Sequence, residues 1–178
     1  MAYFLTVFGI IAGVVALDQI TKLIVVKTMA VGETVDIISG VFRFTHIKNP
    51  GAAFGMLKDA RWVFILFSLV GIAVLMVYLV KFKPKEKLLY IPMSMIVGGG
   101  IGNMIDRMFF GETFGNGKVV DFLDFYAFGE LWTWVFNVAD ACVCVGAGLM
   151  MLYLVIEIIK EEKMKKAESA DKAEDKAE

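Results

Sequence analysis

The chain has 178 residues, of which 58% are hydrophobic and 21% are charged, and its formal net charge is −1. Soluble domains are about 45–50% apolar with charges spread along the chain, whereas here long blocks contain no charge. This pattern predicts an integral membrane protein and excludes disordered, collagen-like, coiled-coil and disulfide-scaffold classes. Without a basic excess, nucleic acid is excluded as a partner.

Four apolar blocks are long enough to cross a bilayer, because a hydrocarbon core about 30 Å thick requires about 20 helical residues. They cover about residues 3–26, 62–80, 88–106 and 132–159. We therefore expect an all-α membrane protein with four transmembrane helices, forming one domain over residues 1–160. The first charged residue after the initiator is Asp18. A cleavable secretory signal is thus not expected, and the first block should be retained as an anchor.

Lysine-rich segments predict the orientation. Residues 81–87 contain four lysines, and four more follow the last block within residues 160–166. The positive-inside rule makes both segments cytoplasmic, which puts both termini in the cytoplasm and the loop of residues 27–61 outside. The tail, residues 161–178, mixes Lys, Glu, Asp and Ala without an apolar face. We expect it to be a charged cytoplasmic tail that is disordered or a solvated helix.

The outer loop contains a short alternating segment, Val41-Phe-Arg-Phe-Thr-His-Ile47. Alternation of aromatic and β-branched residues with a period of two is typical of strands. The sequence therefore predicts a small β-containing outer subdomain at the membrane surface.

Polar residues recur near the outer end of three of the four blocks. Because ionisable groups are costly inside a membrane, they are expected to face the protein interior or a water-filled cavity. Within each block their spacing is three or four residues, which puts each set on one helix face. The last outer loop adds Asp121 and Asp124. The residues of this outer polar layer in the blocks are Asp18, Lys22, Asn103, Asp106, Arg107, Asn137 and Asp140.

The residue types limit the chemistry of such a site. His46 is the only histidine, and the two cysteines, Cys142 and Cys144, point to different sides of a helix, so a zinc site is not expected. Ser94 lies about three helical turns from Asp106, which disfavours a serine nucleophile. Two neighbouring carboxylates that share a proton can activate water for amide hydrolysis without a metal or cofactor. Residue spacing leaves open which acids these are, among Asp18, Asp106, Asp121, Asp124 and Asp140.

Two other classes remain possible. A small transporter would use intramembrane polar groups to pass an ion, but its polar residues are expected across the midplane rather than in one outer layer. A non-enzymatic scaffold would use the same groups as interhelical ion pairs, which is the ordinary role of a pair such as Asp18 and Lys22. The glycines of residues 98–102 predict close helix packing through Gly98-x-x-x-Gly102.

Five motifs together resemble the bacterial lipoprotein signal peptidase (signal peptidase II) family. They occur in the family's order and span residues 18 to 140, so their combination is far more specific than any single motif. The motifs are Asp18-Gln-Ile-Thr-Lys22, Asn49-Pro-Gly-Ala-Ala-Phe54, Gly98-Gly-Gly-Ile-Gly-Asn-Met-Ile-Asp-Arg107, Val119-Val-Asp-Phe122 and Phe136-Asn-Val-Ala-Asp140.

The resemblance implies an aspartyl endopeptidase with Asp121 and Asp140 as its catalytic residues. The implied substrate is a prolipoprotein whose signal peptide is removed on the amino side of a diacylglyceryl-modified cysteine. The resemblance also implies a bacterial cytoplasmic membrane location with the site near the outer face, sensitivity to globomycin-type inhibitors, and contact with membrane lipid; we expect a monomer. The residues implied to line or brace the site are Asp18, Lys22, Asn49, Gly99, Asn103, Asp106, Arg107 and Asn137.

Overall fold

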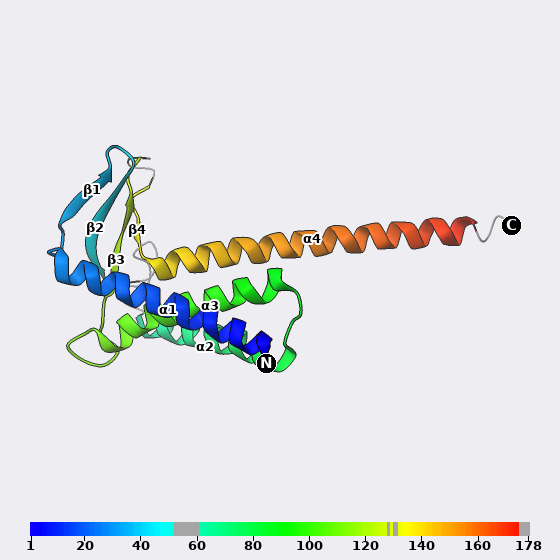
Figure 1. Cartoon of the computed structure of the whole chain (residues 1–178), viewed down its shortest axis with the longest axis horizontal. Coiled ribbons are helices and arrows are strands. Elements are labelled where there is room, and N and C mark those ends of the chain that lie inside the picture. The colour runs from blue at the N-terminus through cyan, green and yellow to red at the C-terminus, as the bar shows by residue number, and fades with distance from the viewer. Residues whose placement is uncertain (52–60, 128, 130–131, 175–178) are drawn as a thin grey trace.

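The computed structural model describes residues 1–51, 61–127, 129 and 132–174, and it contains four long helices (Figure 1). These are α1 (Ala2–Thr28), α2 (Arg61–Phe82), α3 (Lys87–Phe109) and α4 (Val138–Glu174). Each contains a stretch long and apolar enough to cross a membrane. Large apolar side chains are exposed along the helices, as expected where lipid replaces water as the solvent; Leu66, Phe67 and Leu154 are examples. The predicted fold class is confirmed.

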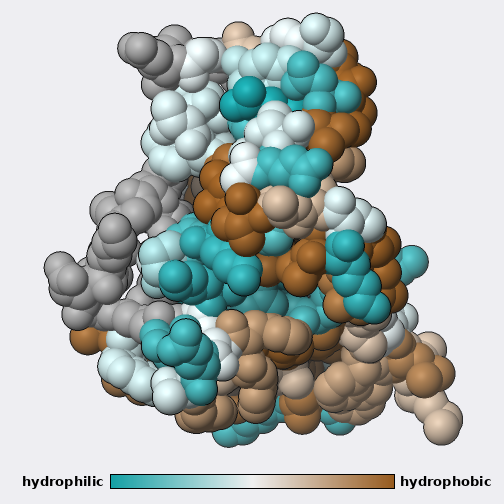
Figure 2. Space-filling view, turned by 90° about the vertical axis from the view of Figure 1, so that its left-hand side faces the viewer, coloured by the Kyte–Doolittle hydropathy of each residue, from teal (hydrophilic) through white to brown (hydrophobic). Residues whose placement is uncertain are grey.

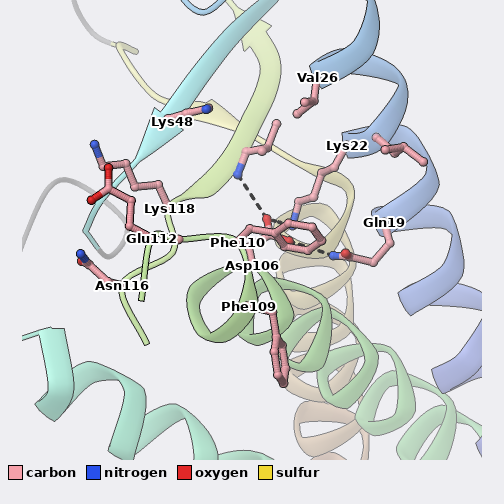
Figure 3. Close-up of a pocket in the computed structure, with 13 residues that line it drawn as sticks. Gln19, Lys22, Val26, Lys48, Asp106, Phe109, Phe110, Glu112, Asn116 and Lys118 are labelled. Atoms are coloured by element: carbon pink, nitrogen blue, oxygen red, sulfur yellow. Dashed lines mark hydrogen bonds and ion pairs between the residues drawn. The ribbon is translucent and has the colours of Figure 1, made fainter. Parts of the chain in front are cut away.

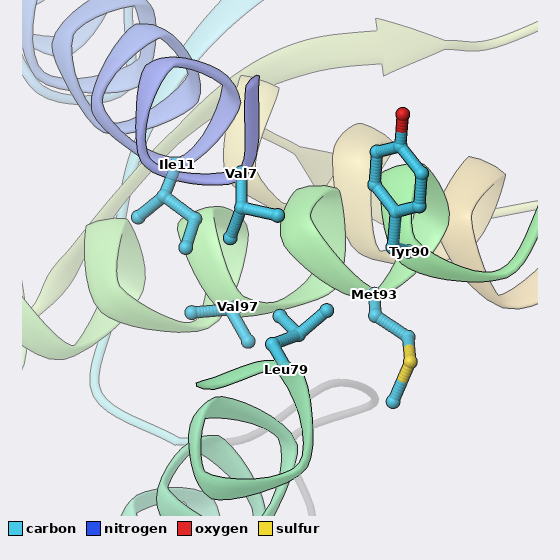
Figure 4. Packing of buried hydrophobic residues seen from close by; sticks show 6 residues of the cluster. All are labelled: Val7, Ile11, Leu79, Tyr90, Met93 and Val97. Atoms are coloured by element: carbon cyan, nitrogen blue, oxygen red, sulfur yellow. The ribbon is translucent and has the colours of Figure 1, made fainter. Parts of the chain in front are cut away.

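Helix α3 is the centre of the bundle, because α1, α2 and α4 all pack against it. A buried cluster joins α1, α2 and α3; its members are Val7, Ile11, Leu79, Tyr90, Met93 and Val97 (Figure 4). The glycines of α3 permit the close approach that the sequence predicts. A Cβ on Gly98 would lie 2.8 Å from Cβ of Val14, and a Cβ on Gly99 would collide with the carbonyl oxygen of Ala139 in the first turn of α4.

A four-stranded antiparallel sheet lies at one end of the bundle, beside the end of α1 and the start of α4 (Figure 1). Its strands, in the order β1-β2-β3-β4, are β1 (Thr34–Ile38), β2 (Phe42–Asn49), β3 (Val119–Phe125) and β4 (Val135–Phe136). Seen from this end, the surface mixes hydrophilic and hydrophobic residues, as expected near a membrane interface (Figure 2).

The first two strands confirm the predicted β-containing outer loop, but the sheet also recruits β3 and β4 from the last outer loop. The sequence does not signal β3, because five of its seven residues are buried and no period of two is visible. Val120 and Phe122, on either side of Asp121, are buried with Val25 of α1. This packing fixes β3 against the end of the bundle.

Both ends of α4 differ from the prediction. The helix begins at Val138 rather than near Trp132, because residues 135–136 pair with β3 instead. It then continues through Glu174, so residues 161–174 are helical in the structure, which is one of the two states that the sequence leaves open for the tail. Lys, Glu and Ala are strong helix formers, which explains this extension. Residues 175–178 lie outside the described residues.

Candidate active site

The polar residues of α1, α3, α4, β2 and β3 meet where the bundle joins the sheet. Most of them are buried, and the rest are half-buried: Asp18 and Asn137 are 0% exposed, and Asp106 is 2% exposed. A buried polar group is costly unless it is hydrogen-bonded, so such a layer must form a connected network. The contacts described below satisfy that requirement.

Asp140 is fixed by the start of α4. Oδ1 of Asn137 accepts a hydrogen bond from the backbone N–H of Asp140 at 2.9 Å, and Oδ2 of Asp140 accepts one from the N–H of Asn137 at 3.2 Å. This reciprocal arrangement is a capping box, which begins a helix and holds the side chain of its third residue. Oδ1 of Asp18 accepts the next free amide, the N–H of Ala139, at 3.0 Å. An acid of α1 thereby anchors the turn that carries Asp140.

Asp121 reaches the same place from β3. Its Oδ2 accepts a hydrogen bond from Nδ2 of Asn49, at the end of β2, at 2.9 Å. Its Oδ1 accepts one from Nδ2 of Asn137 at 2.6 Å. Asn137 therefore contacts both Asp121 and Asp140, and it links the sheet to α4.

Asn103 of α3 completes the link between the two acids. Its Nδ2 donates to Oδ1 of Asp140 at 2.7 Å, and its Oδ1 accepts from Nδ2 of Asn137 at 3.0 Å. Nζ of Lys22 also donates to Oδ1 of Asn103 at 2.9 Å. Two asparagine side chains thus hold Asp121 and Asp140 in one hydrogen-bond network.

A second pair of acids surrounds Lys22. Its Nζ lies 2.8 Å from Oδ2 of Asp18 and 2.9 Å from Oδ2 of Asp106, and its side chain is 4% exposed. Oδ2 of Asp106 also accepts the backbone N–H of Val120 at 3.2 Å, which fixes β3 one residue before Asp121. Gln19, which we did not predict as a site residue, donates from Nε2 to Oδ1 of Asp106 at 2.9 Å. Its place between Asp18 and Lys22 is the signal that could have identified it.

Arg107 and Gly99 support the site from α3. Nη2 of Arg107 donates to the carbonyl of Gly51 at 3.1 Å, so it holds the outer loop just after Asn49. Gly99 packs on the carbonyl of Ala139, one residue before Asp140. Of the motif that begins at Asn49, the last residues, 52–54, lie outside the described residues.

Asp124 lies outside the hydrogen-bond network that joins Asp121 and Asp140. Its Oδ2 accepts hydrogen bonds from Nε of Arg43 at 2.6 Å and from Oγ1 of Thr45 at 2.7 Å, both on β2. The structure therefore brings together Asp121, Asp140 and all the supporting residues expected from the sequence, and it places Asp124 in a separate pairing between strands.

Asp121 titrates abnormally. Burial, and after it the charge of the nearby Asp140, raise the pKa of Asp121 to about 7, against the hydrogen bonds from Asn49 and Asn137, which lower it. Near neutral pH, the side chain of Asp121 is therefore divided between its acid and its carboxylate forms.

A hollow of about 800 Å³ flanks the network on the side of α1 (Figure 3). Gln19, Lys22 and Asp106 are among its polar lining residues, and Leu23 and Phe109 are among its apolar ones. Asp121 and Asp140 are not among its lining residues. The Lys22 cluster thus separates the two acids from this hollow.

The chain is similar throughout to one family of proteins. The family model described as signal peptidase (SPase) II matches residues 10–156. A lipoprotein signal peptidase of Symbiobacterium thermophilum is 41% identical over 150 residues, which are 84% of this chain and 93% of that protein. One from Bacillus pumilus is 39% identical over 157 residues, which are 88% and 94% of the two chains.

Two solved structures share the fold. A bacterial membrane enzyme structure obtained by the in meso method at 2.3 Å resolution has a TM-score of 0.76 and 29% identity, and the match covers 86% of this chain and 89% of that one. A second, at 1.9 Å resolution, has a TM-score of 0.72 and 30% identity, covering 84% and 92%. The chain therefore belongs to the signal peptidase (SPase) II family of membrane-spanning peptidases.

Proposed function

We propose that the protein is an aspartyl endopeptidase that removes signal peptides from diacylglyceryl-modified prolipoproteins, cutting on the amino side of the lipidated cysteine. The observation that carries this proposal is the pair Asp121, which is buried, and Asp140, which is half-buried, two carboxyl groups from different elements that share Asn137 as a partner. Two acids that share one proton can act as acid and base in amide hydrolysis.

In this mechanism Asp140 is the general base. Its carboxylate takes a proton from a water molecule as the water oxygen bonds to the scissile carbonyl carbon. The protonated Asp121 donates a hydrogen bond and then its proton to the carbonyl oxygen, which gives a neutral tetrahedral diol. When the C–N bond breaks, Asp140 returns its proton to the leaving nitrogen, and Asp121 takes one from a hydroxyl group. The products are a carboxylic acid and an amine, and the carboxyl groups regain their initial states.

The surroundings of the two acids support these roles. Asn103 and the backbone amide of Asn137 donate to Asp140, so its ionised form has hydrogen-bond partners. The raised pKa of Asp121, about 7, keeps a substantial fraction protonated near neutral pH. One acid is thus suited to accept a proton and the other to donate one.

We also propose that both termini are cytoplasmic and that the site lies near the outer face of a bacterial cytoplasmic membrane. Lysines follow α2 and lie in the last part of α4, at the ends of the bundle opposite the sheet (Figure 1). In this orientation the lipid-bearing end of a substrate reaches the site laterally from the bilayer. Inhibition by globomycin-type compounds and a monomeric state are further expectations.

The proposal is tested by cleavage of a purified diacylglyceryl prolipoprotein in detergent. The wild type and Asp140→Asn are compared, each with a thermal melt. We expect the wild type to cut before the lipidated cysteine and the variant to lose about 10³-fold or more in kcat, since general acid–base catalysis contributes about 10²–10⁴-fold and the dyad acts as a unit. The melting temperature should stay close to that of the wild type, because an asparagine oxygen can still accept the amide bond of the capping box.

Other outcomes identify the other classes. If Asp140→Asn cleaves normally, Asp140 is not the base and the mechanism fails. If the variant loses its melting transition together with cleavage, the acid is structural, as in a scaffold. If the wild type does not cleave a substrate that lipoprotein-processing membranes do cleave, a transporter or scaffold becomes the better interpretation.

A further inference from the structure

A second hollow lies at the other end of the bundle, far from the sheet in sequence and in the fold. It has a volume of about 550 Å³ and lies between the start of α1 and the turn that joins α2 to α3. Three lysines line it, Lys83, Lys85 and Lys87, together with Phe4 and Tyr90. No acidic residue is among its lining residues.

The positive charge in this hollow has no acidic counterpart among its lining residues. Among the residues that the structure describes, no salt bridge involves any of the three lysines. Glu86 is their acidic neighbour in sequence, but it does not line the hollow, and its side chain makes no capping hydrogen bond. The hollow beside the active site is different, because Asp106 and Glu112 lie among its lysines.

Two helix N-termini add to this positive potential. α1 begins at Ala2 and α3 begins at Lys87, and both residues line the hollow. Neither helix has a side-chain cap or an acidic residue in its first turn. Free N–H groups and the positive end of the helix dipole attract anions, and here two such ends accompany three lysines.

The apolar side of the hollow continues along the membrane-facing surface of α1. The ring of Phe4 stacks on that of Phe8 with centroids 6.1 Å apart, and Phe8 and Leu5 are 46% and 70% exposed. Nζ of Lys83 lies 5.1 Å from the centre of the Phe4 ring, which holds one ammonium group against this apolar wall. A ligand that fits must therefore combine an anionic group with an apolar chain.

We propose that this hollow binds the headgroup of an anionic phospholipid, with the phosphate among Lys83, Lys85 and Lys87 and an acyl chain along Phe4 and Phe8. The hollow is at the end of three membrane-spanning helices, which is the level of lipid headgroups. Basic residues at this level attract anionic lipids, and a pocket makes that attraction local. The site does not depend on the catalytic proposal, since none of its residues contacts Asp121 or Asp140.

Native mass spectrometry of the purified protein in detergent tests the proposal, with dioleoylphosphatidylglycerol as the added lipid. The test variant carries Lys83→Gln, Lys85→Gln and Lys87→Gln. The matched control carries Lys163→Gln, Lys165→Gln and Lys166→Gln, which removes the same charge from the exposed end of α4. We expect the wild type and the control to bind the lipid within about twofold of each other, and the test variant to bind at least about tenfold more weakly.

Two further ligands define the chemistry. Dioleoylphosphatidylcholine, with the same chains but no net charge, should bind at least about tenfold more weakly than the anionic lipid to the wild type. Glycerol 3-phosphate, which lacks the chains, should not displace the lipid. Equal loss of lipid in the test and control variants would show only general attraction to lysines and would overturn the site. Displacement by glycerol 3-phosphate would overturn the lipid as its occupant.

A thermal melt without added lipid checks that the test variant folds. All three lysines are exposed, so its melting temperature should equal that of the control. If the triple variant melts lower, the single variant Lys85→Glu, in the turn between the helices, is used instead. Retained lipid binding in Lys85→Glu would then count against the proposal.

Discussion

Two pairs of acids lie within one hydrogen-bond network, and their charges are compensated in different ways. Asp18 and Asp106 both contact the ammonium group of Lys22. Asp121 and Asp140 instead accept hydrogen bonds from uncharged amides, those of Asn49, Asn103 and Asn137. Amides stabilise a carboxylate without neutralising it, whereas a cation does both.

This difference suggests a structural role for the pair around Lys22 and a catalytic role for Asp121 and Asp140. The pair around Lys22 carries a compensating charge, and it connects α1 to α3, to the start of α4 and to β3. The pair without a cation is protonated in part near neutral pH, as the raised pKa of Asp121, about 7, indicates. We therefore expect substitutions in the first pair to affect mainly stability and those in the second to affect mainly turnover.

The largest change in stability is expected from Lys22→Met. Removal of one partner of a buried ion pair costs about 3–5 kcal/mol, because the remaining charges are left uncompensated. Here two carboxylates lose their cation. Thermal or denaturant unfolding in detergent measures the loss, and Lys27→Met, at the exposed end of α1, is the control with the same change of charge. A Lys22→Met protein as stable as this control would contradict the structural role.

The pH dependence of stability tests the second pair of acids, through the titration of Asp121. The pKa of Asp121 is about 7 in the folded protein and 3.8 in its ordinary state. Between these values the folded state binds more protons than the unfolded state, so stability falls as pH rises, by at most about 1.4 kcal/mol per unit. Asp121→Asn removes this titration. Its melting temperature should depend less on pH between about 4 and 7 than that of the wild type.

The pH dependence of kcat should report the titration of the same group, Asp121. Cleavage requires the acid form of Asp121 in the proposed mechanism, so kcat should fall about tenfold per pH unit above about 7. A melting profile that is identical in Asp121→Asn and in the wild type would argue against the raised pKa. A kcat that stays constant to pH 9 would argue against Asp121 as the proton donor.

Much of this arrangement was predictable from the sequence. Charge-free blocks define four spans, and the depth of Asp18, Asp106 and Asp140 in those spans predicts one polar layer. The strand that carries Asp121 was not predictable in this way, because its contacts are with residues distant in sequence and its burial on both sides hides the alternation. The start of α4 was missed because pairing with β3 overrides the apolar pattern of residues 132–136.

A smaller effect is expected from Gly99→Ala, which tests how tightly the first turn of α4 must be held. A methyl group there meets the carbonyl of Ala139, so α4 must shift by a fraction of an ångström next to Asp140. Overpacking of this kind costs about 1–3 kcal/mol. We expect lower stability together with a lower kcat. Gly148→Ala, where nothing lies within 4 Å of an added Cβ, is the control. Equal behaviour of the two variants would show that the contact is not restrictive.

The smallest effect on turnover is expected from Asp124→Asn, although Asp124 is only three residues from Asp121. Its partners are Arg43 and Thr45, and the side chains of Arg43 and Asp124 are 36% and 8% exposed, so water screens this pair from the side of Arg43 only. An asparagine oxygen can still accept from both partners, so the loss should be about 1 kcal/mol, as for an exposed pair, rather than the larger cost of a fully buried one. A double-mutant cycle with Arg43→Met measures this coupling, while kcat should stay within about threefold of the wild type. If Asp124→Asn melts normally but fails to cleave, the catalytic acid of β3 is Asp124. Asp124 would then replace Asp121 in the catalytic pair of carboxylates.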